Sequence, residues 1–344
     1  MRRVDALLNN PWVVIPLRIL IVIGFILTLV PGLVWLERRV LALMQIRKGP
    51  NRVGPAGLLQ PVADGIKLFF KEDVVPERVD RFIYFLAPAG FLIPVLIAPA
   101  IIPWGPNDRL TPIADVNIGI LFLLAMTSLT VYGIVLAGWS SNNKYSLLGG
   151  LRASAQTISY ELAMGLSIIS VVLLTGSLSM RDMVLNQQGS LGMLNWHVFR
   201  FFPLGLIATG IFLVAMLAET NRAPFDLPEA ESELIAGYHT EYSSMKFAMF
   251  FMGEYASMIT ISAVMVTLFF GGWLPPLPFA PFTWVPGPIW FLLKLGVFIY
   301  FFIWVRATLP RLRYDMLMKL GWLRLLPTAL VNLFLVAIIV WWQK

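Results

Sequence analysis

The chain has 344 residues, of which 58% are hydrophobic and only 13% are charged. Soluble domains contain about 45–50% apolar and about 25% charged residues, so this composition indicates an integral membrane protein. The absence of cysteine excludes disulfides, thiolate-held zinc and iron–sulfur clusters within this chain, and two histidines, His197 and His239, leave little for another metal site. The net charge of +7 fits the usual excess of Lys and Arg in cytoplasmic loops, so no nucleic-acid partner is expected.

Long apolar runs follow one another along the chain and are separated by short polar segments. A helix that crosses about 30 Å of hydrocarbon needs about 20 mostly apolar residues. We therefore predict an all-α polytopic membrane protein that forms one transmembrane domain over residues 1–344. The eight predicted spans lie near 13–36, 82–103, 116–138, 155–175, 201–219, 247–271, 287–309 and 324–342.

Lys and Arg are divided unevenly between the two sides of this predicted arrangement. The loops that follow spans one, three, five and seven carry 18 of them, whereas the opposite side, termini included, carries six. Because cytoplasmic loops carry the excess, we expect these four loops in the cytoplasm and both termini outside. Arg18 and Lys294 lie within spans near the outer end, where their long stems can reach the interface.

A shorter segment between spans one and two, residues 56–71, is too charged to cross a membrane. Its apolar residues recur at roughly helical spacing, with Asp64 and two lysines among them. This pattern predicts an amphipathic helix that lies in the membrane interface. Pro61 interrupts the pattern, and a plain cytoplasmic loop is the alternative.

The loop between spans five and six, residues 219–246, carries six carboxylates on the side that should be positive. Acidic residues weigh little in topology, so membrane insertion neither forbids nor explains this cluster. The acids alternate with apolar residues such as Phe225 and Leu227. We therefore expect this acidic cytoplasmic loop to be folded against another surface.

Two carboxylates lie inside predicted spans. Glu161 and Glu254 each fall about seven residues from the cytoplasmic end of a span, a depth of about 10 Å at about 1.5 Å per residue. With Glu37 and Glu219 at the ends of spans one and five, four carboxylates are expected in the cytoplasmic third of the membrane. Carboxylates at such depth are costly and predict a proton relay, with polar helix packing or an ion pair inside a span as the alternative.

A basic cluster lies at the predicted inner surface, after spans one and seven. Its members are Arg38, Arg39, Arg47, Lys48, Arg52, Arg311 and Arg313. Topology and phospholipid headgroups account for most of these charges. The sharper alternative is a polar mouth through which an amphiphile with a polar head and an apolar tail could pass.

Two long stretches carry a specific resemblance. They are ERRVLALMQIRKGPNRVGPAGLLQPVADGIKLFFKE from Glu37 and AETNRAPFDLPEAESELIAGYHTEYSSMKFAMFFMGEY from Ala218. Both closely resemble the family of the H subunit of proton-translocating NADH–quinone oxidoreductase, respiratory complex I, and the similarity covers essentially all the spans. The resemblance implies a subunit of the bacterial inner membrane that joins the peripheral arm to the membrane arm and helps form a quinone chamber.

The resemblance also implies roles for particular residues. Those expected to line or support the quinone path are Glu37, Arg38, Asp64, Phe225, Arg311 and Arg313. Those expected to form a proton relay are Glu161, Glu219, Asp226, Glu229, Glu231, Glu233 and Glu254. Quinone is the implied substrate, while FMN and iron–sulfur clusters are expected only in partner subunits of complex I; membrane lipids are further expected partners.

Other functions stay open on the sequence alone. A freestanding proton-coupled secondary transporter could use the same carboxylates, although no internal repeat typical of such transporters is evident. The chain could also be a structural anchor, or the equivalent subunit of a membrane-bound hydrogenase or a ferredoxin-linked complex. No P-loop, dinucleotide-binding or hydrolase motif is present, so the chain is not expected to catalyse a reaction alone.

Overall fold

The computed structural model describes residues 11–106, 113–227 and 235–343, and every regular element within these ranges is a helix. Seven of the helices described there are long and apolar enough to cross a membrane. A further apolar helix, α8 (Leu204–Glu219), has 16 residues. The described chain is therefore an all-α polytopic membrane protein, as the composition predicts.

Each of the eight predicted apolar runs falls on a helix. The other helices concerned are α2 (Pro11–Met44), α4 (Arg81–Ile97), α5 (Gly119–Ser140), α6 (Lys144–Thr175), α10 (Ser244–Phe269), α11 (Gly287–Thr308) and α13 (Leu326–Gln343). A short helix, α12 (Tyr314–Lys319), leads through a π-helical turn into α13. α2 and α6 extend well beyond the apolar runs that predicted them, because charged side chains lower the hydropathy of their ends without breaking the backbone hydrogen-bond pattern.

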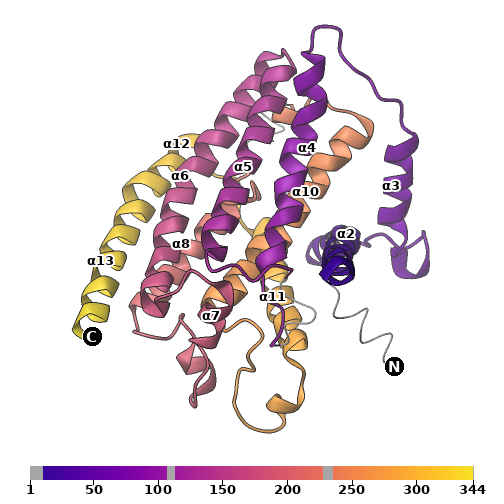
Figure 1. The fold of residues 1–344 in the computed structure, drawn as a ribbon. Coiled ribbons are helices and arrows are strands. Elements are labelled where there is room, and N and C mark those ends of the chain that lie inside the picture. Colours follow the sequence, from indigo (N-terminus) through magenta and orange to yellow (C-terminus); the bar gives the residue numbers. More distant parts are fainter. Residues whose placement is uncertain (1–10, 107–112, 228–234, 344) are drawn as a thin grey trace.

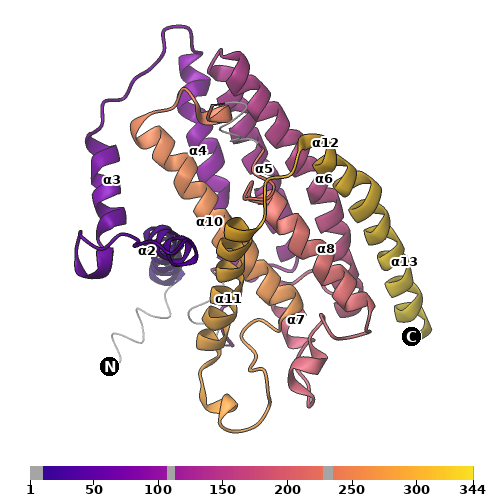
Figure 2. The ribbon, with the colours of Figure 1, turned by 180° about the vertical axis from the view of Figure 1, so that it is seen from behind.

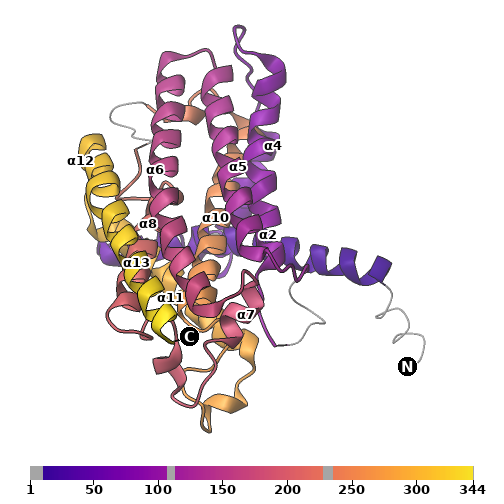
Figure 3. The same cartoon turned by 60° about the vertical axis from the view of Figure 1, so that its left-hand side comes forward.

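The helices form a bundle around α10. α4, α5 and α6 stand side by side, and α13 flanks α6 on the outside (Figure 1). α8 and α11 pack on α10 from the other side (Figure 2), and α2 lies across the bundle instead of along it (Figure 3). In the most apolar stretch of α10, 78% of the residues are buried, against 17% in α2 and in the α12–α13 segment. α10 is therefore the central helix of the described structure.

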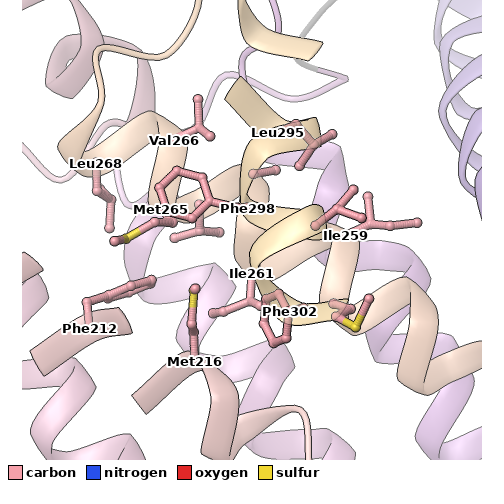
Figure 4. Packing of buried hydrophobic residues seen from close by; sticks show 14 of the residues in the cluster. Phe212, Met216, Ile259, Ile261, Met265, Val266, Leu268, Leu295, Phe298 and Phe302 are labelled. Atoms are coloured by element: carbon pink, nitrogen blue, oxygen red, sulfur yellow. The ribbon is translucent and has the colours of Figure 1, made fainter. Parts of the chain in front are cut away.

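Close packing holds this bundle together. Phe, Met and aliphatic side chains of α8, α10 and α11 interlock in the core, among them Phe212, Met265 and Phe298 (Figure 4). Lipid is as apolar as these side chains, so helix association in a membrane depends on packing and on small residues that allow close approach. Gly133 of α5 is such a residue, because a Cβ there would lie 2.6 Å from the backbone nitrogen of Phe91 in α4.

The predicted amphipathic segment contains a helix, α3 (Gln60–Phe70), beside α2 and α10. The helix follows a 3₁₀ turn, Pro55–Gly57, in which Ala56 and Gly57 have left-handed φ values of 53° and 75°. Pro61 lies in the first turn, where its missing N–H costs no helical hydrogen bond, so it does not interrupt the helix. Val62, Ile66 and Phe70 are exposed and give α3 an uncovered apolar face.

Lys294 of α11 fixes the C-terminal end of α10. Its Nζ donates hydrogen bonds to the carbonyl oxygens of Phe270 (2.7 Å), Gly272 (2.9 Å) and Leu274 (2.7 Å). The same Nζ lies 4.1 Å from the ring centroid of Trp196. Carbonyls left over at the end of α10 therefore act as the acceptors for this ammonium group, and its predicted place at the membrane interface stays a prediction.

Gln187 and His197 tie the segment between α7 (Met180–Leu185) and α8 to the same end of α10. The Gln187 Oε1 accepts from the backbone N–H groups of His197 (3.2 Å) and Gly271 (2.9 Å). The His197 Nδ1 donates to the carbonyl oxygen of Leu268, 2.6 Å away. His197 is completely buried, and burial lowers the pKa of its imidazole to about 4, so the ring is neutral at physiological pH.

Candidate functional site

A pocket of about 340 Å³ lies between α2, α10 and α11. Three phenylalanines of α10, Phe247, Phe250 and Phe251, line it together with two carboxylates, Glu37 of α2 and Glu254 of α10. We refer to this space as the α2–α10–α11 pocket. It combines an aromatic wall with buried charge, which is an arrangement suited to an amphiphilic ligand.

Glu37 is 5% exposed and belongs to the part of α2 beyond the predicted span. Its carboxylate forms an ion pair with Arg306, in the last turn of α11. The hydroxyl of Tyr255 donates a 2.7 Å hydrogen bond to Glu37 Oε2. A buried carboxylate needs such partners, because desolvation otherwise makes its charge very costly.

Glu254 is 6% exposed and has a similar set of partners. The Nη2 of Arg222 lies 3.6 Å from its Oε2, and the hydroxyl of Tyr238 donates a 2.8 Å hydrogen bond to its Oε1. The Arg222 guanidinium also lies over the ring of Tyr255, 4.2 Å from the centroid. Since Tyr255 bonds to Glu37, Arg222 and Tyr255 connect the two carboxylates of the pocket.

A second, internal cavity of about 30 Å³ lies between α4, α5, α8 and α10. Half of the residues that line it are apolar, and the other half supply hydroxyl groups, an amide and two carboxylates: Thr127, Thr130, Thr157, Thr220, Ser257, Thr260, Asn221, Glu219 and Glu254. A space of this volume can hold a water molecule, and the lining supplies the polar partners that a buried water requires. We refer to it as the hydroxyl-lined cavity.

Glu219 and Glu161 differ from the carboxylates of the pocket in their partners. The Oε2 of Glu219 is buried and has no hydrogen-bond partner within the described ranges. Glu161 accepts a hydrogen bond from the hydroxyl of Ser128 and acts electrostatically on Glu219. In the part of the chain that the structure describes, neither carboxylate forms an ion pair with Lys or Arg.

The described part of the acidic loop is folded against α6. Gln156 donates 2.8 Å hydrogen bonds to the carbonyl oxygens of Ala218 and Phe225, and the Phe225 ring packs on Tyr160 with 5.4 Å between centroids. Asp226 pairs with Arg311 at 3.1 Å. The three remaining predicted relay acids of this loop, Glu229, Glu231 and Glu233, lie outside the described residues.

The residues expected on the quinone path are not all in one place. Arg38 lines the α2–α10–α11 pocket with Glu37, and its Nη1 pairs with Asp64 of α3 at 2.6 Å. Phe225 and Arg311 do not line this pocket, and the side chain of Arg313 is 81% exposed beside Asp315.

Sequence reasoning missed the partners that hold the pocket carboxylates: Arg222, Tyr238, Tyr255 and Arg306. From the sequence, Arg222 and Arg306 are only two of the 18 positive charges that predict the topology. One signal was present, since Tyr255 follows Glu254 directly and Arg222 stands in the AETNR stretch. Arg222 pairs with Glu254, which is 32 positions away, and Arg306 pairs with Glu37, which is 269 positions away. No local sequence pattern predicts pairs at such separations.

The fold and these sites define a multi-pass membrane protein with a charged, aromatic-lined pocket and buried carboxylates. The sequence profile of the family described as NADH dehydrogenase matches residues 17–337, and the chain belongs to that family. This membership makes it a subunit of an oxidoreductase complex and sets aside the freestanding transporter.

Several relatives support the assignment over nearly the whole chain. The H subunit of NADH-quinone oxidoreductase from Rhodospirillum rubrum is 51% identical over 327 residues, which cover 95% of this chain and 94% of that protein. The second H subunit of the same enzyme from Koribacter versatilis is 50% identical over 343 residues, covering 94% and 96%. The H subunit from Rickettsia peacockii is 49% identical over 327 residues, covering 95% and 94%.

Proposed function

We propose that this chain forms part of the quinone chamber of an NADH–quinone oxidoreductase and relays the energy of quinone reduction to proton translocation. The observation that carries the proposal is the α2–α10–α11 pocket, which three phenylalanines line together with Glu37 and Glu254. A quinone has a polar head and an apolar tail, and such a wall offers contacts to both. The names of the relatives, which specify quinone as the acceptor, agree with this ligand.

The proposed route of the quinone tail is along α3. This helix exposes apolar side chains and is tied to α2 through the Arg38–Asp64 ion pair and through hydrogen bonds from Trp35 and Arg39 to the carbonyl oxygen of Ala56. An amphipathic helix with an uncovered apolar face is suited to the membrane interface. Quinone would pass from the bilayer beside α3 and α2 and bring its head toward the chamber shared with peripheral subunits.

The proposed proton relay runs through four carboxylates. Glu37 and Glu254 border the pocket, Glu254 and Glu219 border the hydroxyl-lined cavity, and Glu161 lies within electrostatic reach of Glu219. Quinone reduction changes the charge in the chamber, and a few kcal/mol of such electrostatic change is enough to alter the protonation of a buried carboxylate. Asp226, Glu229, Glu231 and Glu233 would contribute from the acidic loop.

The proposed arrangement in the membrane follows from the charge distribution. We assign the chain to the bacterial inner membrane, with both termini outside and the acidic loop in the cytoplasm, where it would meet the peripheral subunits that hold FMN and iron–sulfur clusters. Small subunits of the membrane arm would be the neighbours on the other side. Cysteine labelling of single-cysteine variants at Lys144 and Gln343 tests this topology, and labelling of both from the same side would overturn it.

Substitution of the deep carboxylates tests the relay. Glu254→Gln and Glu161→Gln, each in the assembled complex, are expected to lower proton translocation because the amide cannot accept or release the transferred proton. The measurement is NADH–quinone turnover together with proton translocation in sealed vesicles. Glu241→Gln is the control, because Glu241 is bound by Asn143 (2.6 Å) and lines neither cavity. Normal turnover and normal translocation in both variants would remove the relay from the proposal.

A photoreactive quinone tests the pocket. Cross-linking in the assembled complex is expected at Phe247 or Phe251, and an excess of unmodified quinone should compete with it. Competed labels found only at exposed sites on α11 or α13 would place the quinone elsewhere.

A further inference from the structure

Glu254 occupies a special position between the two cavities. Among the residues that line the hydroxyl-lined cavity and those that line the α2–α10–α11 pocket, it is the one residue of the described chain that they share. The pocket side of its carboxylate is held by Arg222, which borders the pocket but not the cavity. A proton that moves between these two spaces through polar groups would therefore meet Glu254.

We propose that Arg222 is a gating residue that controls proton passage through Glu254. The inference rests on the proposed function and concerns its regulation. While Arg222 lies beside Oε2 and the Tyr238 hydroxyl donates to Oε1, a cation and a hydrogen-bond donor face the Glu254 carboxylate and oppose the arrival of a proton. When Arg222 withdraws, Glu254 takes a proton from the pocket and later gives it to the hydroxyl-lined cavity toward Glu219, so Glu254 ends each cycle unchanged and Arg222 stays protonated.

The surroundings of Arg222 supply the means of its movement. At 3.6 Å its Nη2 is near Glu254 without a short hydrogen bond, while its guanidinium lies over the Tyr255 ring at 4.2 Å. The hydroxyl of Tyr255 bonds to Glu37, the second carboxylate of the pocket. Arg222 thus lies between two carboxylates, and a change of charge in the pocket shifts its preference from Glu254 toward Glu37 or toward an anionic ligand.

The loop that carries Arg222 allows such a change without repacking α10. Arg222 follows the end of α8 and precedes the part of the acidic loop that Gln156 ties to α6, so the backbone is held while a long side chain can reorient. Glu254 itself is part of the central helix and is fixed. The arginine is therefore the movable member of the pair.

The test measures the number of protons translocated per electron in the assembled complex in vesicles. Arg222→Gln is expected to translocate fewer protons per electron at whatever rate of quinone reduction it retains, because protons then cross Glu254 without control by the pocket. Arg222→Lys, which keeps a cation, is expected to restore much of the coupling. A ratio equal to that of the unmodified complex in Arg222→Gln would overturn the gate.

Lys246→Gln is the matched control. Lys246 lies on α10, its side chain is 10% exposed like that of Arg222, and it is paired with Asp73 at 2.8 Å, but it lines neither cavity. Its variant is expected to leave the ratio unchanged. The same loss of coupling in Lys246→Gln would show a general effect of removing a buried cation and would also overturn the gate.

The double variant separates the gate from the relay. If Arg222 acts through Glu254, Arg222→Gln combined with Glu254→Gln has the ratio of Glu254→Gln alone. An additional loss in the double variant contradicts the gate. Normal translocation in Glu254→Gln excludes Glu254 from the relay and with it the gate, whereas a defective Glu254→Gln with a normal Arg222→Gln excludes only the gate.

Discussion

The two ends of α10 hold charged side chains in different ways. At the C-terminal end, Lys294 donates to three backbone carbonyls, which are neutral acceptors that cannot exchange a proton with it. In the other half, Glu254 has a charged partner on a loop and a tyrosine hydroxyl, and it borders two cavities. A charge within the membrane domain thus indicates function only where it borders open space and has partners that can be exchanged.

The largest effect is expected where removal of a cation leaves a buried charge. Arg306→Gln leaves Glu37 without its ion-pair partner, which costs about 1–3 kcal/mol for a pair that is partly exposed on the arginine side. We expect the variant complex to lose most of its NADH–quinone activity and to inactivate at lower temperature. Activity assays before and after graded heating measure both effects.

The double variant Glu37→Gln with Arg306→Gln is the control for stability. Both charges are then gone, so heat resistance should return while quinone turnover stays low. Recovery of turnover in the double variant would show that Glu37 has only a structural role.

Lys294→Met is expected to lower stability while quinone turnover stays normal, the reverse of the double variant Glu37→Gln with Arg306→Gln. It leaves three carbonyl groups without their charged donor and should destabilise the subunit by about 3 kcal/mol. Turnover and translocation per assembled complex should be unchanged, because no proton path is proposed there. Retention of this subunit in the complex after heating is the measurement, with exposed Lys144→Met as the comparison. A coupling defect without loss of stability would break the contrast between the two ends of α10.

Much of the fold could be predicted from the sequence, since runs of about 20 apolar residues leave few structures other than helices in a membrane. That Glu161 and Glu254 lie within helices of membrane-spanning length could be predicted for the same reason. The crossing position of α2 could not, because it depends on packing against α10 and α11. The Arg222–Glu254 and Arg306–Glu37 pairs also escaped prediction, since they depend on contacts between distant segments.

Motif similarity predicts Phe225 on the quinone path, and this stays a prediction. Its ring is 3% exposed and packs on Tyr160, and it does not line the α2–α10–α11 pocket. Its neighbour Asp226 pairs with Arg311. In the described chain these contacts hold the part of the loop that directly follows Arg222.

His197, which is bound to the C-terminal end of α10, should make the stability of the protein depend on pH. Burial lowers its pKa to about 4, below the ordinary value of 6.5, so the unfolded chain binds a proton at a higher pH than the folded one. The free energy of unfolding therefore has its full value above about pH 6.5. It decreases as the pH falls toward about 4, by at most about 3 kcal/mol. Thermal unfolding of the complex between these pH values should therefore be less pH-dependent in His197→Gln. An equal pH dependence in both proteins would contradict the assignment.

The smallest effect is expected at the ion pair between α2 and α3. Asp64→Asn removes a pair with Arg38 whose side chains are 47% and 27% exposed, and such pairs contribute up to about 1 kcal/mol. We expect the KM for quinone to rise up to about fivefold with kcat unchanged. Arg313→Ala, at a more exposed position, should leave both constants as they are. A larger change in the KM for quinone in Arg313→Ala than in Asp64→Asn would indicate that the quinone path does not follow α3.

The most direct test of the central claim is the infrared difference spectrum that accompanies quinone reduction in the assembled complex. If Glu254 changes its protonation during turnover, the spectrum contains a carboxylic-acid carbonyl band that is absent in Glu254→Gln and retained in Glu241→Gln. Persistence of every carboxylic-acid band in Glu254→Gln would contradict the account.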